Sequence, residues 1–487
     1  MLILLFLLPL SSPLAAPSSP PGSPGGTVWT HFGGLVSSSP DPSLISNLGQ
    51  GFPDSPPPAF VRNQLQKAME EGAAPHQYTR SSGHPLLVKE LASRYSQHLA
   101  RDLDPLTSVA ITVGASQALY LSLQSLISPG DEVVIFEPYF DLYLSQVKLA
   151  GGTPVFVPLD FTPFSDPSGR GGEWTMNPER LKAAVGPRTR CVILNSPHNP
   201  TGKVFTRGEM QDIADAISPF PRAVVLSDEV YKFIVHSPPA LPPGAPAERV
   251  PGHTHFASLP GMYERTLTIS SAGKTFSATG WQVGWAIGPE SLIAPIQEML
   301  PSVQFCASTL MQEAIAKALP LADEEYEDPA SGKKYVSYYA WLLREYTEKR
   351  DFLVRALEGA GFRVPDYSKV AGGGFFIFAQ VTDEITSEIP ADVLGRECAA
   401  APGGRAGEGW ALCEYLLESK GVGLIPASPF FSTQSAANEQ FVRVAFCKNR
   451  KVIEEAGRAL LCTSGGGEEG EEEDSQCQAL LESASLT

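Results

Sequence analysis

The segment Thr266-Leu-Thr-Ile-Ser-Ser-Ala-Gly-Lys-Thr275 joins an apolar run to a lysine that lies among small residues. Thr266–Ile269 predicts a short strand, so Lys274 follows at the carboxyl end of that strand. Small neighbours leave room for a bulky group on the amine, and burial would lower its pKa toward that of a useful nucleophile. A solvated surface lysine is the ordinary alternative, and the segment alone leaves it open.

Five more short apolar runs precede this one, and stretches with helical spacing separate them. Runs that are apolar at every position are typical of parallel strands buried on both faces. Their alternation with helices predicts an α/β sandwich with right-handed crossovers, in which ligands gather at the carboxyl ends of the strands. The runs are Val109–Val113, Val133–Phe136, Thr153–Leu159, Cys191–Leu194 and Ala223–Leu226.

The last of these runs ends in an acidic segment, Ser227-Asp-Glu-Val-Tyr231. A carboxylate at the end of a buried strand needs a cationic partner. Asp228 could pair with a pyridinium nitrogen and keep such a ring protonated as an electron sink, and the hydroxyl of Tyr231 could reach the phenolate oxygen of the same ring. An ordinary N-cap or loop acid is the alternative.

Two further strand ends carry candidate binding groups. In Asn195-Ser-Pro-His-Asn-Pro-Thr-Gly202, two X-Pro steps predict an extended loop that would fix the Asn199 amide, although simple turn chemistry favours the same residues. Gly114-Ala-Ser-Gln117 precedes a helix whose first N–H groups, with the Ser116 hydroxyl, could bind a phosphate. An ordinary N-cap serine explains this second segment equally well.

The region after about Lys334 has a different pattern. Tyr335–Leu357 predicts a long helix, Gly372–Phe378 a Gly-rich strand and Phe441–Phe446 an apolar strand, which together indicate a smaller α+β domain. Arg443 lies inside the last of these strands and needs an anion there. A bidentate contact with a substrate carboxylate would provide one, and a buried structural ion pair is the alternative.

Composition excludes several classes of function. The formal net charge of −17, from 36 Lys and Arg against 53 Asp and Glu, argues against a nucleic-acid partner or an electrostatic membrane partner. Seven cysteines, an odd number with no C-x-x-C pair, predict neither a disulfide framework nor a metal site. Their usage fits a reducing compartment.

Both ends of the chain are expected to lie outside the folded region, which should span residues 27–462. In residues 1–26, Leu2–Leu10 resembles the apolar core of a secretory signal, but the first basic residue is Arg62 and the run is too short to cross a bilayer. The compartment therefore stays open between cytoplasm and an organelle such as a mitochondrion or plastid. Residues 463–487 contain the acidic run Glu468–Asp474 and predict a disordered tail.

These segments together resemble the class I/II aminotransferases of pyridoxal-phosphate fold type I. Within them, the sequence is most similar to the group of kynurenine aminotransferase, glutamine transaminase K and cysteine-S-conjugate β-lyase. The likeness extends from about Thr27 to Leu461 and rests on Asn47–Asp54, Gln77–Thr79, Asn195–Gly202, Ser227–Tyr231 and the highly specific block Ser271–Trp281.

The resemblance implies a large cofactor domain, residues 76–330 approximately, with a mainly parallel seven-stranded sheet in an α/β/α sandwich. A smaller α+β domain would combine residues 27–75 with 331–462. The implied cofactor is pyridoxal 5′-phosphate, the implied substrates are an amino acid and a 2-oxo acid, and the implied assembly is a homodimer.

Roles carried over from the family fall on the residues already singled out. Lys274 would be the Schiff-base lysine and proton shuttle, Asp228 would pair with the pyridine nitrogen, and Tyr231 would hold the phenolate oxygen with Asn199. The other implied contacts are with the phosphate (Ala115, Ser116, Ser271 and the partner subunit's Tyr78), the ring (Phe140), the α-carboxylate (Arg443, Gly51, Asn199) and the pocket border (Trp29, with Phe305).

The sequence departs from the family at Gln282, where a Lys or Arg usually contacts the cofactor phosphate. The leader, the Ala399–Gly409 insertion and the acidic tail are also extra and are expected at the surface. The leading function is transfer of the amino group of an aromatic, sulfur-containing or glutamine-type amino acid. A β-lyase using the same site and a cofactor-binding protein without catalysis are the alternatives; a cyclopropane amino-acid synthase shares the fold but is less similar in the motifs.

Overall fold

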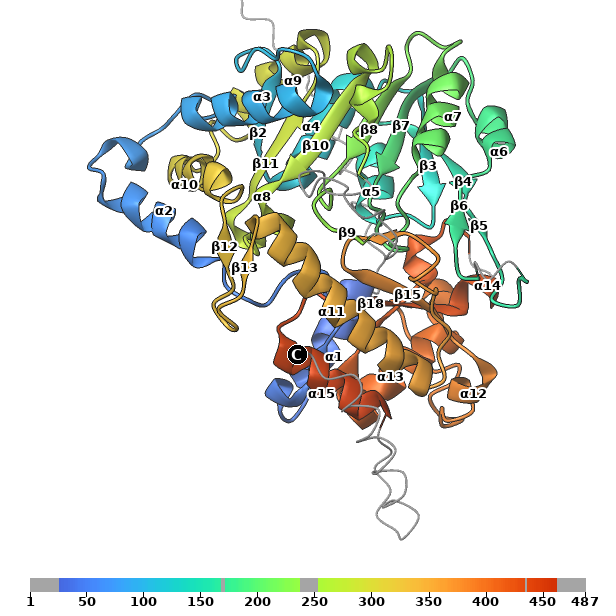
Figure 1. Ribbon diagram of the computed structural model, residues 1–487. Coiled ribbons are helices and arrows are strands. Elements are labelled where there is room, and N and C mark those ends of the chain that lie inside the picture. The colour runs from blue at the N-terminus through green and yellow to red at the C-terminus, as the bar shows by residue number, and fades with distance from the viewer. Residues whose placement is uncertain (1–25, 168–170, 237–252, 434–435, 462–487) are drawn as a thin grey trace, which may run out of the picture.

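The computed structural model describes residues 26–167, 171–236, 253–433 and 436–461 (Figure 1). Its centre is a seven-stranded sheet with the strand order β2-β11-β10-β8-β7-β3-β4. Only β11 runs antiparallel to its neighbours, so the expected mainly parallel seven-stranded sheet is confirmed. The strands are β2 (Val109–Val113), β3 (Glu132–Glu137), β4 (Thr153–Pro158), β7 (Thr189–Asn195), β8 (Val224–Asp228), β10 (Thr266–Ser271) and β11 (Val283–Ile287).

Both faces of this sheet are buried, which explains why its strands are apolar at nearly every position. Successive side chains point to opposite faces: Val133 and Ile135 of β3 join one apolar core, and Val134 and Phe136 join the other. The first core includes side chains from α4 (Gly114–Leu126), α5 (Leu142–Leu149) and α9 (Glu290–Val303). The second includes side chains from α3 (Pro85–Leu99), α6 (Pro178–Ala184) and α7 (Arg207–Ile217).

The antiparallel strand β11 is a feature that the sequence analysis did not anticipate. A glycine, Gly284, interrupts its apolar pattern, and a Cβ atom there would lie 2.2 Å from the carbonyl carbon of Gly114. The glycine therefore allows β11 to lie against the first residues of α4. This contact matters because the start of α4 belongs to the site described below.

A smaller α+β unit lies beside the sheet, and both ends of the described chain contribute to it (Figure 1). Near the N-terminus, β1 (Ser46–Asn47) pairs in parallel with β16 (Val422–Gly423). A three-stranded sheet, β15-β18-β17, holds the strand that carries Arg443. The elements of this unit are α1 (Val28–Ser38), α11 (Tyr338–Gly359), α12 (Asp383–Thr386), α13 (Glu408–Lys420), α14 (Ala436–Glu439), α15 (Arg450–Leu461), β15 (Phe376–Gln380), β17 (Ile425–Pro426) and β18 (Phe441–Ala445).

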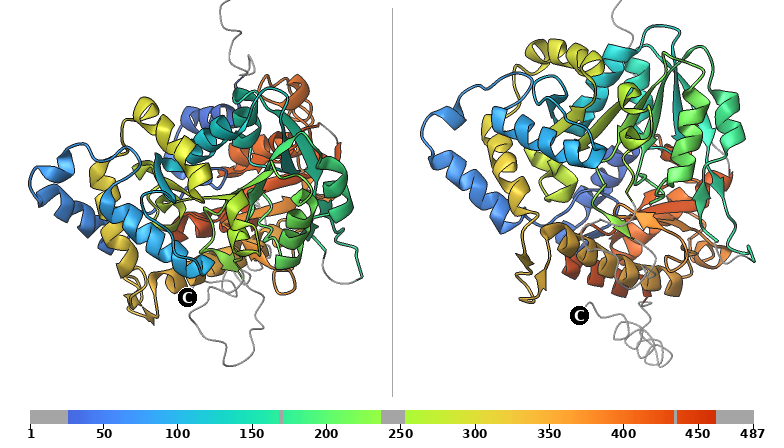
Figure 2. Two further views of the ribbon diagram at one scale, coloured as in Figure 1. Left: turned by 90° about the horizontal axis from the view of Figure 1, so that it is seen from above. Right: turned by 45° about the horizontal axis from the view of Figure 1, so that its top comes forward.

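At one edge of the molecule, α2 (Ala59–Glu70) packs against α10 (Thr309–Leu321) (Figure 2). The domain boundaries near residues 75 and 330 stay predictions. Among the described residues, no helix has both the length and the apolar character needed to span a membrane. The remaining short elements are α8 (Ala272–Thr275), β5 (Asp160–Phe161), β6 (Trp174–Thr175), β9 (Val235–His236), β12 (Tyr326–Glu327), β13 (Lys334–Tyr335) and β14 (Gly372–Gly373).

Two expectations about the extra segments can be compared with the structure. The Ala399–Gly409 insertion exposes residues 403–405, but Ala401, Ala406 and Gly409 are buried. The two alanines pack into the core of the smaller unit, and the expected surface position is wrong for these three residues. Residues 1–25 of the leader and 462–487 of the tail lie outside the described residues. The predictions about them, including the compartment, stay predictions.

Candidate active site

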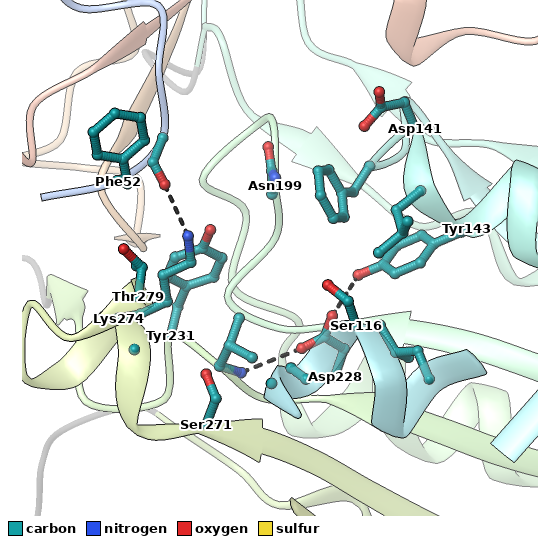
Figure 3. Close-up of a pocket in the computed structure, with 18 of the residues that line it drawn as sticks. Phe52, Ser116, Asp141, Tyr143, Asn199, Asp228, Tyr231, Ser271, Lys274 and Thr279 are labelled. Atoms are coloured by element: carbon teal, nitrogen blue, oxygen red, sulfur yellow. Dashed lines mark hydrogen bonds between the residues drawn. The ribbon is translucent and has the colours of Figure 1, made fainter. Parts of the chain in front are cut away.

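A cavity of about 630 Å³ lies at the carboxyl edge of the central sheet, next to the smaller unit (Figure 3). Because the parallel strands end at this edge, the segments that follow β2, β3, β7, β8 and β10 meet there. All the predicted site residues line it except Tyr78 and Phe305: Trp29, Gly51, Ala115, Ser116, Phe140, Asn199, Asp228, Tyr231, Ser271, Lys274, Gln282 and Arg443.

Lys274 lies in the single-turn helix α8, which begins directly after β10. Its Nζ donates a hydrogen bond to the carbonyl oxygen of Gly51 at 2.8 Å and has no carboxylate partner among the described residues (Figure 3). Burial of the amine lowers the pKa of Lys274 from 10.5 to about 8. The solvated surface lysine is therefore excluded, and the side chain has the environment of an amine nucleophile.

Asp228 is buried at the end of β8, and its Oδ2 accepts a hydrogen bond of 2.7 Å from the hydroxyl of Tyr143. Burial raises the pKa of Asp228 to about 6, although the Tyr143 bond acts in the opposite direction. A cation beside this carboxylate would restore its ordinary ionisation, which is what a pyridinium nitrogen supplies. Tyr143 was missed by the sequence analysis, since nothing in its local pattern distinguishes it from a core tyrosine of α5.

The loop after β7 is fixed by a side chain that the motif contained but that received no role. Asn195 accepts a hydrogen bond from the backbone N–H of Asn199 at 2.7 Å and donates one to the carbonyl oxygen of Asp228 at 3.1 Å. The Asn199 side chain is thereby directed into the cavity beside Tyr231, which is also buried. Two hydrogen-bonding side chains, Asn199 and Tyr231, thus line the same cavity as Asp228 and would hold the phenolate oxygen of the cofactor ring.

Arg443 is fully buried, and no carboxylate of the described residues forms an ion pair with it. Its Nη1 donates to Asn199 Oδ1 at 3.0 Å and its Nη2 to the Gly49 carbonyl oxygen at 2.9 Å, while Nε has no partner among the described residues. Burial lowers the pKa of Arg443 to about 10, still well above neutrality. The structural ion pair is therefore excluded, and a buried cation without an anion faces the cavity.

The start of α4 forms the third side of the cavity. Gly114 adopts a left-handed φ of +72°, and the next amides belong to the first helical turn, where N–H groups lack helical partners. The side chains of Ser116 and Ser271 reach the same region (Figure 3). A helix N-terminus with two hydroxyl groups suits a phosphate dianion. The groups that line the cavity fit pyridoxal 5′-phosphate: an amine (Lys274), a carboxylate (Asp228), a phenol (Tyr231), an amide (Asn199) and the phosphate seat at the start of α4.

Gln282 lies beside this phosphate seat, and its Nε2 donates to the Thr279 carbonyl oxygen at 2.6 Å. It offers a neutral amide at the position where the family resemblance implies a cation, and a charge-assisted contact to phosphate is about twice as strong as a neutral one. We expect Gln282→Lys to lower the dissociation constant of the cofactor about tenfold, or roughly 1–2 kcal/mol, measured by fluorescence titration of apoprotein. An unchanged constant in Gln282→Lys, with Gln282→Met as the uncharged control, would show that other donors already satisfy the phosphate.

The outer wall of the cavity is aromatic, with one carboxylate. Trp29 of α1 donates its indole N–H to Asp141 Oδ2 at 2.7 Å, and Phe140 and Phe376 line the same wall. Asp141 was not anticipated, because its role depends on a tryptophan more than a hundred positions away. Phe305 does not line the cavity of its own chain: it is 55% exposed, with its ring 4.5 Å from that of Tyr78. Its expected place at the pocket border stays a prediction.

Comparison with known proteins agrees with this geometry. Residues 44–460 match the family "Aminotransferase class I and II". The chain is 37% identical to kynurenine–oxoglutarate transaminase 3 of Bos taurus, over 88% of this chain and 86% of that protein. It is 38% identical to the kynurenine–oxoglutarate transaminase of Dictyostelium discoideum, over 85% of this chain and 90% of that protein.

A solved structure shows the same similarity at the level of the fold. The chain superposes on YbdL of Escherichia coli, for which a methionine aminotransferase function is identified, with a TM-score of 0.72 and 26% identity, over 91% of this chain and 99% of the other. The fold, the cavity at the carboxyl edge of the sheet and these relatives lead to one conclusion. The chain belongs to the class I and II aminotransferases and is a pyridoxal-phosphate-dependent enzyme.

Proposed function

We propose that this enzyme takes the amino group from aromatic, sulfur-containing or glutamine-type L-amino acids, kynurenine among them, and transfers it to a 2-oxo acid. The relatives named for kynurenine and methionine support this range of donors. The observation that carries the proposal is the composition of the cavity wall. Lys274 and Arg443 are the only cationic side chains among the described residues that line it.

The bound cofactor supplies an electron sink for the charge left on the substrate Cα. Asp228 would hold the ring nitrogen in its protonated form, and Tyr143 orients that carboxylate through the 2.7 Å hydrogen bond. Burial lowers the pKa of Lys274 from 10.5 to about 8, so a much larger fraction of this amine is unprotonated near neutral pH than in an ordinary lysine. Lys274 would remove the Cα proton of the substrate and return it at the cofactor's C4′ carbon. Arg443 would bind the α-carboxylate of the substrate. Asn199 accepts a hydrogen bond from Arg443 and would also contact the phenolate oxygen of the cofactor ring.

The side chain of the donor would lie against the wall of Trp29, Phe140 and Phe376. With both cations of the cavity engaged, a second carboxylate on the substrate would have no partner and would also face Asp141. An unpaired carboxylate in such a site is costly. Apolar and aromatic donors are therefore favoured over aspartate and glutamate.

Competition between donors tests this proposal directly. We expect kcat/KM for phenylalanine or kynurenine to exceed that for aspartate by about 100-fold, since an unpaired buried charge costs about 3 kcal/mol, with one shared 2-oxo acid as acceptor. Asp141→Asn should reduce this ratio of kcat/KM values, because it removes a negative charge that would repel the side-chain carboxylate of aspartate. If aspartate were preferred tenfold or more, the assignment of the wall would be wrong.

Elimination from Cβ stays an alternative for donors that carry a leaving group there, because it would use the same Lys274 and Asp228. A cofactor-binding protein without catalysis is disfavoured, since Lys274, Asp228, Tyr231 and Arg443 are all present and line one cavity. Measurement of pyruvate and ammonia from a cysteine S-conjugate, beside the transamination product, would separate elimination from transfer.

We also propose that the enzyme is a homodimer in which Tyr78 completes the phosphate site of the partner. Tyr78 is 79% exposed and does not line the cavity of its own chain, and the exposed Phe305 lies against it. We expect light scattering to give a dimer, and Tyr78→Phe to weaken cofactor binding by about tenfold, the value of one hydrogen bond to a charged group. A monomer with full activity would contradict this proposal.

A further inference from the structure

Three side chains with metal-binding atoms meet in the smaller unit, outside the cofactor cavity. His31 belongs to α1, Cys398 precedes the turn at Pro402–Gly404, and Glu414 belongs to α13. Their ligand atoms all lie within 4.8 Å of one another. We propose that His31, Cys398 and Glu414 form a binding site for a divalent transition-metal ion of the zinc type.

Two of the three distances between ligand atoms are close to the edges of a metal tetrahedron. Nε2 of His31 lies 2.8 Å from Oε1 of Glu414 and 3.8 Å from Sγ of Cys398. Bond lengths of about 2.0–2.1 Å to nitrogen or oxygen and about 2.3 Å to sulfur give tetrahedral edges of about 3.3 Å for N···O and about 3.5 Å for N···S. Each observed separation is therefore within about 0.5 Å of the required edge, so small side-chain movements suffice.

The carboxylate of Glu414 carries the second observation that points to a cation. Glu414 is 2% exposed, and its Oε2 has no hydrogen-bond partner among the described residues. Oε1 is already used by His31 and by the indole N–H of Trp410, at 3.2 Å. The only charged group that pairs with this oxygen among the described residues is Nη1 of Arg396, in an ion pair at 3.6 Å. A buried carboxylate oxygen that accepts no hydrogen bond is incompletely satisfied, and a bound cation would complete its partners.

The nearest competing charge can move away. Nη1 of Arg396 lies 3.6 Å from Oε2 of Glu414 but closer, at 3.2 Å, to the exposed Glu418. Its side chain is 37% exposed, so it can keep the pair with Glu418 when a metal ion arrives. The Cys398 thiolate and the Glu414 carboxylate would then balance the two positive charges of the ion.

The imidazole of His31 is held in place by its neighbours and remains accessible. Its ring packs against Phe32 at 5.1 Å and Trp410 at 5.5 Å between centroids, and its side chain is 22% exposed. That exposure gives an ion a route from solvent and leaves a position for water as fourth ligand. Binding releases the thiol proton of Cys398 and shifts the ring proton of His31 to Nδ1.

The ion would connect the catalytic cavity to a segment that the sequence analysis regarded as an addition to the family fold. Trp29, which lines the cavity, lies two positions before His31 in the same helix. A metal at this site would fasten α1 to α13 and to the segment that leads into the Ala399–Gly409 insertion. Its role is structural, because none of the three ligands lines the cofactor cavity.

Titration of the full-length holoenzyme with Co²⁺, after removal of metals by chelator dialysis, tests the site. We expect the visible bands of four-coordinate Co²⁺ to appear with one ion per chain and to disappear on addition of Zn²⁺. Cys398→Ser should weaken binding by more than about 100-fold, since even changes outside the ligand shell cost about 10–100-fold. Cys306→Ser, which alters a partly exposed thiol elsewhere, should bind as the unmodified enzyme does.

Thermal unfolding gives an independent measurement that does not depend on the cobalt spectrum. Zn²⁺ should raise the Tm of the unmodified enzyme and of Cys306→Ser but not that of Cys398→Ser or Glu414→Gln, because a ligand stabilises only the fold that binds it. The proposal would be overturned if Co²⁺ produced no visible bands, or if Cys398→Ser bound Co²⁺ as tightly as the unmodified enzyme. Rapid alkylation of Cys398 without metal binding would overturn it too and would instead indicate a thiol activated by His31.

Discussion

Replacement of Lys274 by alanine is expected to abolish turnover while the fold survives. The side chain is the only amine in the described part of the cavity, and general acid–base transfer by one group contributes up to about 10⁴-fold in rate. We therefore expect kcat to fall by about 10⁴-fold or more.

The folded-state pKa of Lys274 is about 8, below the ordinary 10.5 of the unfolded chain. The buried charged amine therefore destabilises the apoprotein below pH 8, and the free energy of unfolding rises with pH between pH 8 and pH 10.5.

The same argument predicts that Lys274→Ala apoprotein is no less stable than the unmodified apoprotein at pH 7, measured by urea unfolding. Lys232 offers a matched control, since it is a buried lysine whose pKa burial also lowers to about 8, but it donates to Tyr95 and does not line the cavity. Borohydride reduction of the holoenzyme followed by peptide mapping should place the pyridoxyl label on Lys274. A label on Lys232 or any other lysine would contradict the assignment.

Loss of the buried guanidinium of Arg443 is expected to have the second largest effect. Arg443→Gln should lower kcat/KM for every amino donor by about 100-fold, or roughly 3 kcal/mol, because the substrate carboxylate would be left buried without its cation. The pyridoxal-phosphate content of the purified enzyme should be unchanged, since Arg443 donates to Asn199 and Gly49 and to no residue of the phosphate seat. Steady-state kinetics with phenylalanine, kynurenine and methionine measure the loss.

Two comparisons separate a substrate clamp from a structural role. Arg443→Lys retains the positive charge but cannot make a bidentate contact with a carboxylate. We expect its kcat/KM to lie between those of Arg443→Gln and the unmodified enzyme. The unfolding free energy of Arg443→Gln apoprotein should not fall, because no carboxylate of the described chain pairs with this cation. Equal KM values in Arg443→Gln and the unmodified enzyme would show that another group binds the carboxylate.

The sequence by itself determined six of the seven strands of the sheet and most of the cavity. Short runs that are apolar at every position require burial on both faces, which only a mainly parallel sheet between helices provides. Parallel strands bring their carboxyl ends to one edge, so the residues that follow them, Lys274, Asp228, Asn199 and Ser116, had to meet there. The motif block Ser271–Trp281 then related that edge to a family with pyridoxal phosphate.

Tertiary structure decided the contacts between residues that no local pattern connects. Tyr143 becomes the partner of Asp228, Asp141 the partner of Trp29, and β11 enters the sheet through a glycine that looked like an interruption. His31, Cys398 and Glu414 are also far apart in the chain, so cysteine spacing indicated no metal site. Periodicity and turn chemistry report on neighbours a few positions away, whereas these contacts depend on how whole elements pack, which a single sequence does not specify.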